Sequence, residues 1–84
     1  MLTVSVISAE ATLFEGEATQ VIAPAFDGQV GILTNHAPMI TALGRGTLRV
    51  QSDGSTRRFV VDGGFLQVVD NQVRVVTERA SVSQ

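Results

Sequence analysis

Residues 47–62 read TLRVQSDGSTRRFVVD. Apolar and polar residues alternate from Thr47 to Gln51, and the returning run from Thr56 to Asp62 follows Asp53-Gly54. Alternation with a period of two is typical of half-buried strands. An Asp-Gly pair between two such runs predicts a tight hairpin, because a type I′ turn needs positive φ at both central residues. The stretch therefore predicts two antiparallel strands, with Arg57 and Arg58 on opposite faces of the second.

The same period continues on both sides of this hairpin. Apolar residues alternate from Leu2 to Val6, and Asp70-Asn71 separates two further strand-like runs toward the C-terminus. Gly63-Gly64 predicts a sharp corner or bulge at which the chain changes sheet. Residues 12–24 predict either two short strands or one long bent strand that ends at Pro24.

Gly-rich turns separate roughly eight short runs, and such close spacing of strands is typical of sandwiches and barrels. We therefore predict an all-β fold, a flattened sandwich or barrel, in one domain that spans residues 1–80. The last strand is expected to fade over Glu78-Arg79-Ala80. Residues 81–84 are expected to form a disordered tail.

The composition argues against several classes of protein. The chain has 84 residues, no cysteine, a formal net charge of −2 and six basic side chains, all of them arginine. Without cysteine there is no disulfide, Cys-based zinc site or thiol nucleophile. Without Tyr, Trp or a basic stripe, we expect no nucleic-acid binding. No apolar run reaches the ~18 residues that span a bilayer, and the first residues do not predict a secretory signal.

The segment from Asp27 to Leu43 holds two glycines, the only histidine and one of the two prolines. Gly28 and Gly31 permit positive φ or a close backbone approach, and Pro38 forces the residue before it toward extended geometry. We expect a shaped, exposed turn system between two strands, with apolar residues resuming at Met39.

His36 is the only imidazole, so any triad or metal site would have to form around it. Asp27 is close in sequence and could orient the ring, but the pattern places no nucleophile beside the pair. A closed metal site needs three or four converging ligands, and Glu10, Glu15 and Glu17 are expected on a solvated face. We therefore expect no catalytic residue, metal or cofactor, and a hydrolase built on His36 is the weakest alternative.

A small β-domain with an elaborate loop and no catalytic set is best interpreted as a protein-binding module, whose rigid scaffold holds the loop. A carbohydrate-binding module is a poorer match, because such modules stack Trp or Tyr rings on sugars and this chain has neither. Residue chemistry alone therefore leaves an unspecified β-sandwich adaptor open.

Several motifs, in their order and spacing, resemble one family. They are Val6-Ile7-Ser8-Ala9-Glu10, Leu13-Phe14-Glu15-Gly16-Glu17, Asp27-Gly28-Gln29-Val30-Gly31-Ile32-Leu33, Asn35-His36-Ala37-Pro38 and Val61-Asp62-Gly63-Gly64-Phe65-Leu66-Gln67-Val68. From about Leu2 to Ala80 the chain resembles the N-terminal β-sandwich domain of the epsilon subunit of F-type ATP synthase. The Asn-His-Ala-Pro loop and the Gly-Gly-Phe corner are the most specific parts of the resemblance.

The resemblance implies two sheets of about five strands and a non-catalytic place in the central stalk, which rotates with the gamma subunit and the c-ring and couples proton translocation to ATP synthesis. It implies a peripheral location on the cytoplasmic face of the bacterial inner membrane, or on the stromal side of thylakoids. Typical members continue into a C-terminal helical hairpin that restrains hydrolysis. This sequence stops at Gln84; if that is its natural end, we expect coupling without helix-based inhibition or nucleotide sensing.

Two contact segments also follow from the resemblance, position by position. The loop that faces the c-ring matches Asp27, Gly28, Gln29 and Val30. A segment close to gamma matches His36, Ala37, Pro38, Met39 and Thr41. Many relatives carry an acid where this chain has Gln29, so contact with basic ring loops is expected to depend on Asp27. The usual glycine before the histidine is Asn35, which also tolerates positive φ.

Overall fold

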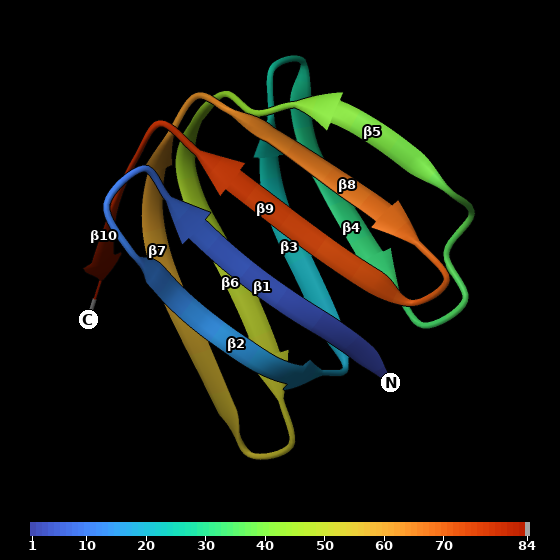
Figure 1. The fold of residues 1–84 in the computed structure, drawn as a ribbon. Helices are drawn as coiled ribbons and strands as arrows, with labels where there is room; N and C mark the ends of the chain where they lie inside the picture. Colours follow the sequence, from blue (N-terminus) through green and yellow to red (C-terminus); the bar gives the residue numbers. More distant parts are fainter. Residues whose placement is uncertain (84) are drawn as a thin grey trace.

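The computed structural model describes residues 1–83, which form ten β-strands (Figure 1). The strands are β1 (Leu2–Ser8), β2 (Thr12–Ala18), β3 (Gln20–Ala25), β4 (Gly28–Leu33), β5 (Met39–Ala42), β6 (Arg45–Ser52), β7 (Ser55–Asp62), β8 (Phe65–Val69), β9 (Gln72–Thr77) and β10 (Arg79–Ser83). The all-β prediction is confirmed. Within the described range no helix has the length and apolarity to cross a membrane.

The strands form two five-stranded sheets that pack face to face (Figure 1). Sheet A has the order β2-β1-β9-β8-β5, and sheet B has the order β10-β7-β6-β3-β4. Every neighbouring pair is antiparallel except β1 and β9, which are parallel. The fold is therefore an open sandwich of two sheets, and the barrel alternative is wrong.

The core fills the space between the sheets with alternate residues of most strands. Phe59 is the largest fully buried side chain, and its ring meets the ring of Phe14 edge to face, with centroids 6.3 Å apart. The other fully or almost fully buried apolar residues are Leu2, Val4, Val6, Ala18, Val21, Ala23, Ile32, Leu43, Leu48, Val50, Val61, Leu66, Val68, Val73 and Val75. This core is aliphatic and closely packed, which makes the sandwich a stiff body.

Both predicted hairpins form, but the turn at Asp53-Gly54 lacks the positive φ expected at both of its central residues. Asp53-Gly54 joins the paired residues Ser52 and Ser55, and of the two turn residues only Gly54 has positive φ, at 77°. Asp70 and Asn71 both have positive φ, at 49° and 62°. In the first turn the positive φ falls on glycine, which adopts it freely. In the second turn it falls on Asp70 and Asn71, whose short polar side chains tolerate positive φ.

The predicted corner at Gly63-Gly64 is confirmed, since it leads from β7 in sheet B to β8 in sheet A. Its φ angles are 77° and 102°. The buried Thr77 Oγ1 lies 3.0 Å from the Gly63 carbonyl oxygen and 2.8 Å from that of Arg79. The Leu43 N–H donates to the Gly64 carbonyl at 2.9 Å. These hydrogen bonds therefore connect the corner to Leu43, just after β5, and, through Thr77, to Arg79 at the start of β10.

Residues 12–24 form two strands, and Pro24 does not end the second, which continues to Ala25. Pro24 is paired with Gln29 of the edge strand β4, while the pairing of β3 with β6 extends only to Ile22. The N–H group that proline lacks is therefore not needed by a ladder on the β6 side.

The expected disordered tail is wrong for residues 81–83. They belong to β10, which pairs antiparallel with β7 from Arg79 opposite Asp62 to Ser83 opposite Arg58. Ala80 packs against the core. An edge strand needs only one ladder and few apolar residues, so a short polar run can form it. Gln84 lies outside the described residues.

Candidate docking surfaces

The exposed turn system expected over Asp27 to Leu43 is wrong for most of the segment, which forms the strands β4 and β5. β4 forms the edge of sheet B, and β5 forms the edge of sheet A on the same side of the molecule (Figure 1). Ile32 is fully buried, and Val30, two residues earlier, packs against the core. The inward face of β4 is thus apolar, while glycine occupies an outward position that needs no side chain.

The β3–β4 hairpin projects from one end of the sandwich, and its turn carries the residues predicted to face the c-ring (Figure 1). Asp27, Gly28 and Gln29 are exposed, whereas the Val30 side chain is half-buried. Phe26, at the turn, is 71% exposed. We call residues 26–29 the tip. The tip offers one free carboxylate beside one exposed aromatic ring.

Backbone hydrogen bonds brace the base of this hairpin. The Phe26 N–H donates to the Ala42 carbonyl at 3.2 Å, and the Gly44 N–H donates to the Pro24 carbonyl at 2.8 Å. These bonds tie the hairpin to the C-terminal end of β5. The tip is therefore held in a defined position relative to the second predicted contact segment.

That second segment begins in the loop between β4 and β5. Asn35 has positive φ, at 68°. Its N–H donates to Asn71 Oδ1 at 2.6 Å, and Asn71 Nδ2 donates to Asn35 Oδ1 at 3.2 Å. The two side-chain amides clamp the loop against the β8–β9 turn. We call residues 35–40 the shoulder.

His36 lies on the shoulder, half-buried. Its N–H donates to the Leu33 carbonyl at 3.1 Å, and its Nδ1 lies 2.7 Å from the Ala37 carbonyl oxygen. Because a carbonyl only accepts, Nδ1 donates in this contact, which holds the orientation of the ring. Asp27 lies beyond the opposite end of β4, and a strand of that length spans about 20 Å. The structure therefore does not bring together the pair on which a hydrolase would depend.

The side chains of β5 alternate between two environments. Met39 and Thr41 are half-buried, and Met39 packs against the core. Ile40 between them is 69% exposed. Ala37 and Pro38 are exposed on the loop before the strand. Of the five positions predicted to contact gamma, three are thus partly withdrawn: His36, Met39 and Thr41. Ile40, which is outside that set, presents a larger exposed apolar surface.

An apolar stripe crosses the outer face of sheet A beside Ile40. Its four residues form one row, because each is the direct partner of the next across β5, β8, β9 and β1: Ala42, Phe65, Val76 and Ile7. Phe65 is 39% exposed. Contiguous apolar surface of this kind marks interaction sites on folded proteins. The stripe and the shoulder together form one candidate docking surface.

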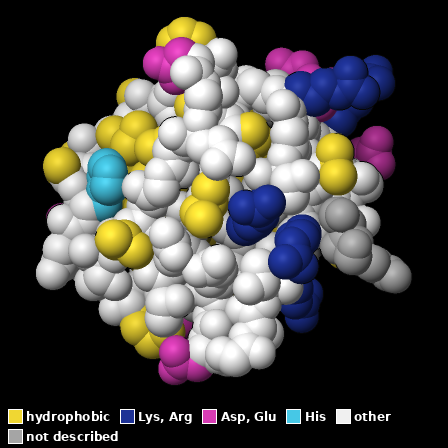
Figure 2. Space-filling model, turned by 180° about the vertical axis from the view of Figure 1, so that it is seen from behind, with side chains coloured by type: hydrophobic (Ala, Val, Ile, Leu, Met, Phe, Trp, Pro, Cys, Tyr) yellow, Lys and Arg dark blue, Asp and Glu magenta, His cyan; other side chains and the backbone are white. Residues whose placement is uncertain are grey.

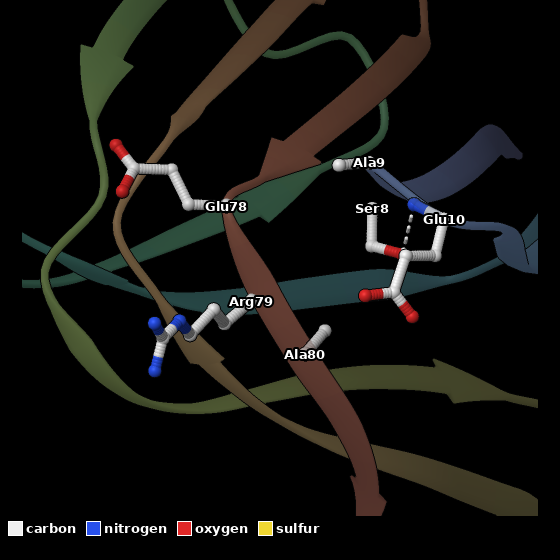
Figure 3. Close-up of a pocket in the computed structure, with 6 residues that line it drawn as sticks. All are labelled: Ser8, Ala9, Glu10, Glu78, Arg79 and Ala80. Atoms are coloured by element: carbon white, nitrogen blue, oxygen red, sulfur yellow. Dashed lines mark hydrogen bonds between the residues drawn. The ribbon is translucent and has the colours of Figure 1, made fainter.

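A shallow hollow lies where the β1–β2 turn meets the β9–β10 corner (Figure 3). Ser8 shapes the turn, since its Oγ accepts hydrogen bonds from the N–H groups of Glu10 at 3.3 Å and Ala11 at 3.2 Å. The carboxylates of Glu10 and Glu78 lie on opposite sides of the hollow (Figure 3). In residues 1–83 no three His, Cys, Asp or Glu side chains gather closely enough to hold a metal ion. The hollow thus offers no converging donor set.

Phe26 and Ile40 are exposed apolar residues outside the predicted contact set. For Ile40 the signal was the period of two in a strand, which places its side chain on the other face of β5 from Met39 and Thr41. For Phe26 the signal was an aromatic residue beside Asp27 in a segment rich in turn residues. Local sequence does not predict the apolar stripe, because the alignment of its four residues depends on pairing between strands that are distant in the sequence.

Comparison with known proteins identifies the family. The family model of the ATP synthase delta/epsilon chain β-sandwich domain matches residues 1–83. The ATP synthase epsilon chain of Synechococcus sp. (strain JA-2-3B'a(2-13)) is 46% identical over 79 residues, which are 94% of this chain and 58% of that protein. The epsilon chain of Leptospira borgpetersenii is 39% identical over 83 residues, which are 99% of this chain and 65% of that protein. The chain thus spans about three-fifths of the length of these curated relatives.

Solved structures share the fold. One chain in the Euglena gracilis mitochondrial ATP synthase (OSCP/F1/c-ring) matches 96% of this chain with a TM-score of 0.89 and 23% identity, over 52% of its own length. A chain in the central stalk and c-ring of the Tetrahymena thermophila mitochondrial ATP synthase matches 95% with a TM-score of 0.79 and 16% identity, over 65% of its own length. On the family match across residues 1–83, the chain belongs to the family of ATP synthase delta/epsilon chain β-sandwich domains.

Proposed function

We propose that this domain is the β-sandwich of a non-catalytic rotor subunit in the central stalk of an F-type ATP synthase. It docks on the gamma subunit and on the c-ring and helps couple proton translocation to ATP synthesis. It meets the membrane only peripherally, through the complex, on the cytoplasmic face of a bacterial inner membrane or the stromal side of a thylakoid. The observation that carries the proposal is the family match over residues 1–83, together with relatives named ATP synthase epsilon chain.

The apolar stripe and the shoulder are the surface we assign to gamma. Together they join Ile40, which is 69% exposed, to Phe65, which is 39% exposed. The backbone holds the His36 ring through Nδ1, so the Nε2 edge of the ring is oriented for contact with a partner. A desolvated apolar centre with polar groups around it is the usual anatomy of a protein interface. Ala37, Pro38, Met39 and Thr41 complete this surface.

The tip is the surface we assign to the c-ring. Asp27 is exposed at the end of a projecting, braced hairpin. A carboxylate in that position complements basic loops on the ring, and such complementarity aids association and register. Gly28 and Gln29 add backbone and amide groups, and the exposed Phe26 adds an apolar contact. Val30 supports the tip from inside the core, so its contribution is to position the neighbouring residues.

The architecture suits the transmission of torque. The two contact surfaces lie on one rigid scaffold, because the hydrogen bonds at Phe26 and Gly44 tie the hairpin to β5. Closely packed interiors have low compressibility and transmit strain. A force applied at the tip is therefore passed to the shoulder with little deformation of the domain.

The substitution Ile40→Asp tests the gamma assignment. A charge at the centre of an apolar interface is expected to weaken binding to the gamma subunit about 30-fold or more, the usual loss at an interface hot spot. Binding is measured by calorimetry with the gamma subunit from the same organism. The matched control is Val60→Asp, because Val60 is 43% exposed on sheet B. Unchanged affinity in Ile40→Asp with a loss in Val60→Asp would move the gamma site to the other sheet.

A further inference from the structure

The outer face of sheet B gathers four of the six arginines of the chain (Figure 2). Directly paired residues on neighbouring strands share a face. Arg49 of β6 pairs with Arg58 of β7, and in a parallel row Asp62 of β7 pairs with Arg45 on one side and Arg79 on the other. The chain is acidic overall, so its net charge conceals a basic face.

The two rows of this face differ in their charge balance. Arg45 and Arg79 flank Asp62, whereas Arg49 and Arg58 are paired with each other and Arg58 is paired with Ser83 on its other side. On its other side Arg49 is paired with Ile22. The Arg49 Nε is buried and has no hydrogen-bond partner in the part of the chain that the structure describes. The arginine pair therefore holds an excess of positive charge and an unsatisfied donor.

We propose that this face, centred on Arg49 and Arg58, docks a carboxylate-bearing segment of another protein. Like charges placed directly opposite in a sheet destabilise it, and an incoming Asp or Glu removes that repulsion. The planar guanidinium presents donors in a fork that matches a carboxylate, and Arg58 is exposed while Arg49 is half-buried. The neutral row beside the pair contains Thr47 opposite Val60, which provides apolar contact around the charges.

Nucleic acid is a poorer occupant of the same face. Binding to single strands uses aromatic rings as stacking platforms, but Phe26 lies at the tip and Phe65 lies on sheet A. The excess of positive charge is confined to the pair Arg49 and Arg58. A phosphate backbone that continued to the row of Arg45 and Arg79 would meet the carboxylate of Asp62. The surface is therefore matched to one or two carboxylates and not to a run of phosphates.

The inference does not rest on the rotor assignment, because Arg49 and Arg58 lie on the sheet opposite the apolar stripe. It is tested by titrating the full chain with poly-L-glutamate and, in a second arm, with oligothymidylate of equal charge, and following backbone amide shifts by NMR. We expect saturable shifts around Arg49 and Arg58 with poly-L-glutamate. Tighter binding of the oligothymidylate at the same salt concentration would overturn the assignment.

Three variants separate a built site from general attraction between opposite charges. Arg58→Glu should weaken poly-L-glutamate binding about tenfold or more, because a charge-assisted contact is lost. Arg49→Lys should also weaken it, although the charge is kept, because lysine lacks the planar fork of donors. The control Arg74→Glu changes the same charge on sheet A and should leave the affinity near that of the parent. Equal losses in Arg58→Glu and Arg74→Glu, or full affinity in Arg49→Lys, would contradict the proposal.

Discussion

Gly64→Ala is expected to lower the free energy of unfolding by more than about 3 kcal/mol, combining backbone strain with a steric overlap. Gly64 has φ of 102°, a region that side-chain-bearing residues rarely adopt. A Cβ there would overlap the Val76 carbonyl oxygen and lie 2.7 Å from the Thr77 Cα. Both neighbours are backbone atoms of β9, where Val76 is paired with Phe65 of β8 and Thr77 is paired with Ser8 of β1, so neither can move aside without disturbing these ladders. Thermal and urea denaturation followed by circular dichroism would measure the loss.

The matched control is Gly31→Ala. A Cβ at Gly31 meets nothing within 4 Å, and its φ is not in the positive region. In a domain of this size about 1 kcal/mol corresponds to a shift of about 4–8 °C in Tm. Gly64→Ala should therefore melt well below Gly31→Ala or fail to fold. Near-equal Tm values for the two variants would show that the corner is not the constrained joint described above.

Phe59→Ala is expected to cost about 3–5 kcal/mol, the range for removal of a buried aromatic side chain. Phe59 has no exposed surface and forms an edge-to-face contact with Phe14 at 6.3 Å. Arg57 adds a cation–π contact, with its guanidinium carbon 5.8 Å from the centre of the Phe14 ring. Loss of the Phe59 ring opens a cavity between the sheets and removes one support of that cluster. Urea unfolding is the direct measurement.

Phe26→Ala is the control for this prediction. Phe26 is 71% exposed, and substitutions at such surface positions usually change stability by less than about 0.5 kcal/mol. A similar loss of stability in the two variants would mean that Phe59 does not anchor the core. If the tip acts as proposed, Phe26→Ala would instead weaken association with the c-ring without changing the Tm.

The sequence predicts correctly those strands and turns whose conformation is determined by their own residues. Alternation identified the strand before Asp53-Gly54, this turn pair identified the hairpin, and adjacent glycines identified the corner at Gly63-Gly64. Local sequence was insufficient for β4, whose outward positions carry Gly31 and Gln29 and so lack the usual alternation, and for β10, a polar edge strand stabilised by pairing with β7. A strand that depends on a distant partner has only a weak signal in its own residues.

The candidate surfaces were only partly predictable for the same reason. Asp27 and His36 lie on exposed or half-exposed segments that the sequence selects, because turn residues mark them. The alignment of Phe65 with Val76, and of Arg49 with Arg58, depends on register between strands. Register follows from the whole sheet and its turns, so neither the apolar stripe nor the basic face was visible as a pattern along the chain.

The most direct test of the rotor assignment is photo-cross-linking from single cysteines in the assembled ATP synthase. The chain contains no cysteine, so Asp27→Cys, Ile40→Cys and Asp53→Cys each provide one thiol in this subunit. A photoreactive maleimide attached to that thiol then probes a different part of the surface in each variant. Asp53 is the control, because its turn lies at the opposite end of the sandwich from the tip (Figure 1).

If the rotor assignment is correct, position 27 gives a cross-linked product with the c subunit and position 40 gives one with gamma. Position 53 gives neither product. Mass spectrometry of the cross-linked bands identifies the partners. Absence of c and gamma products from positions 27 and 40, or their appearance only from position 53, would contradict the rotor assignment.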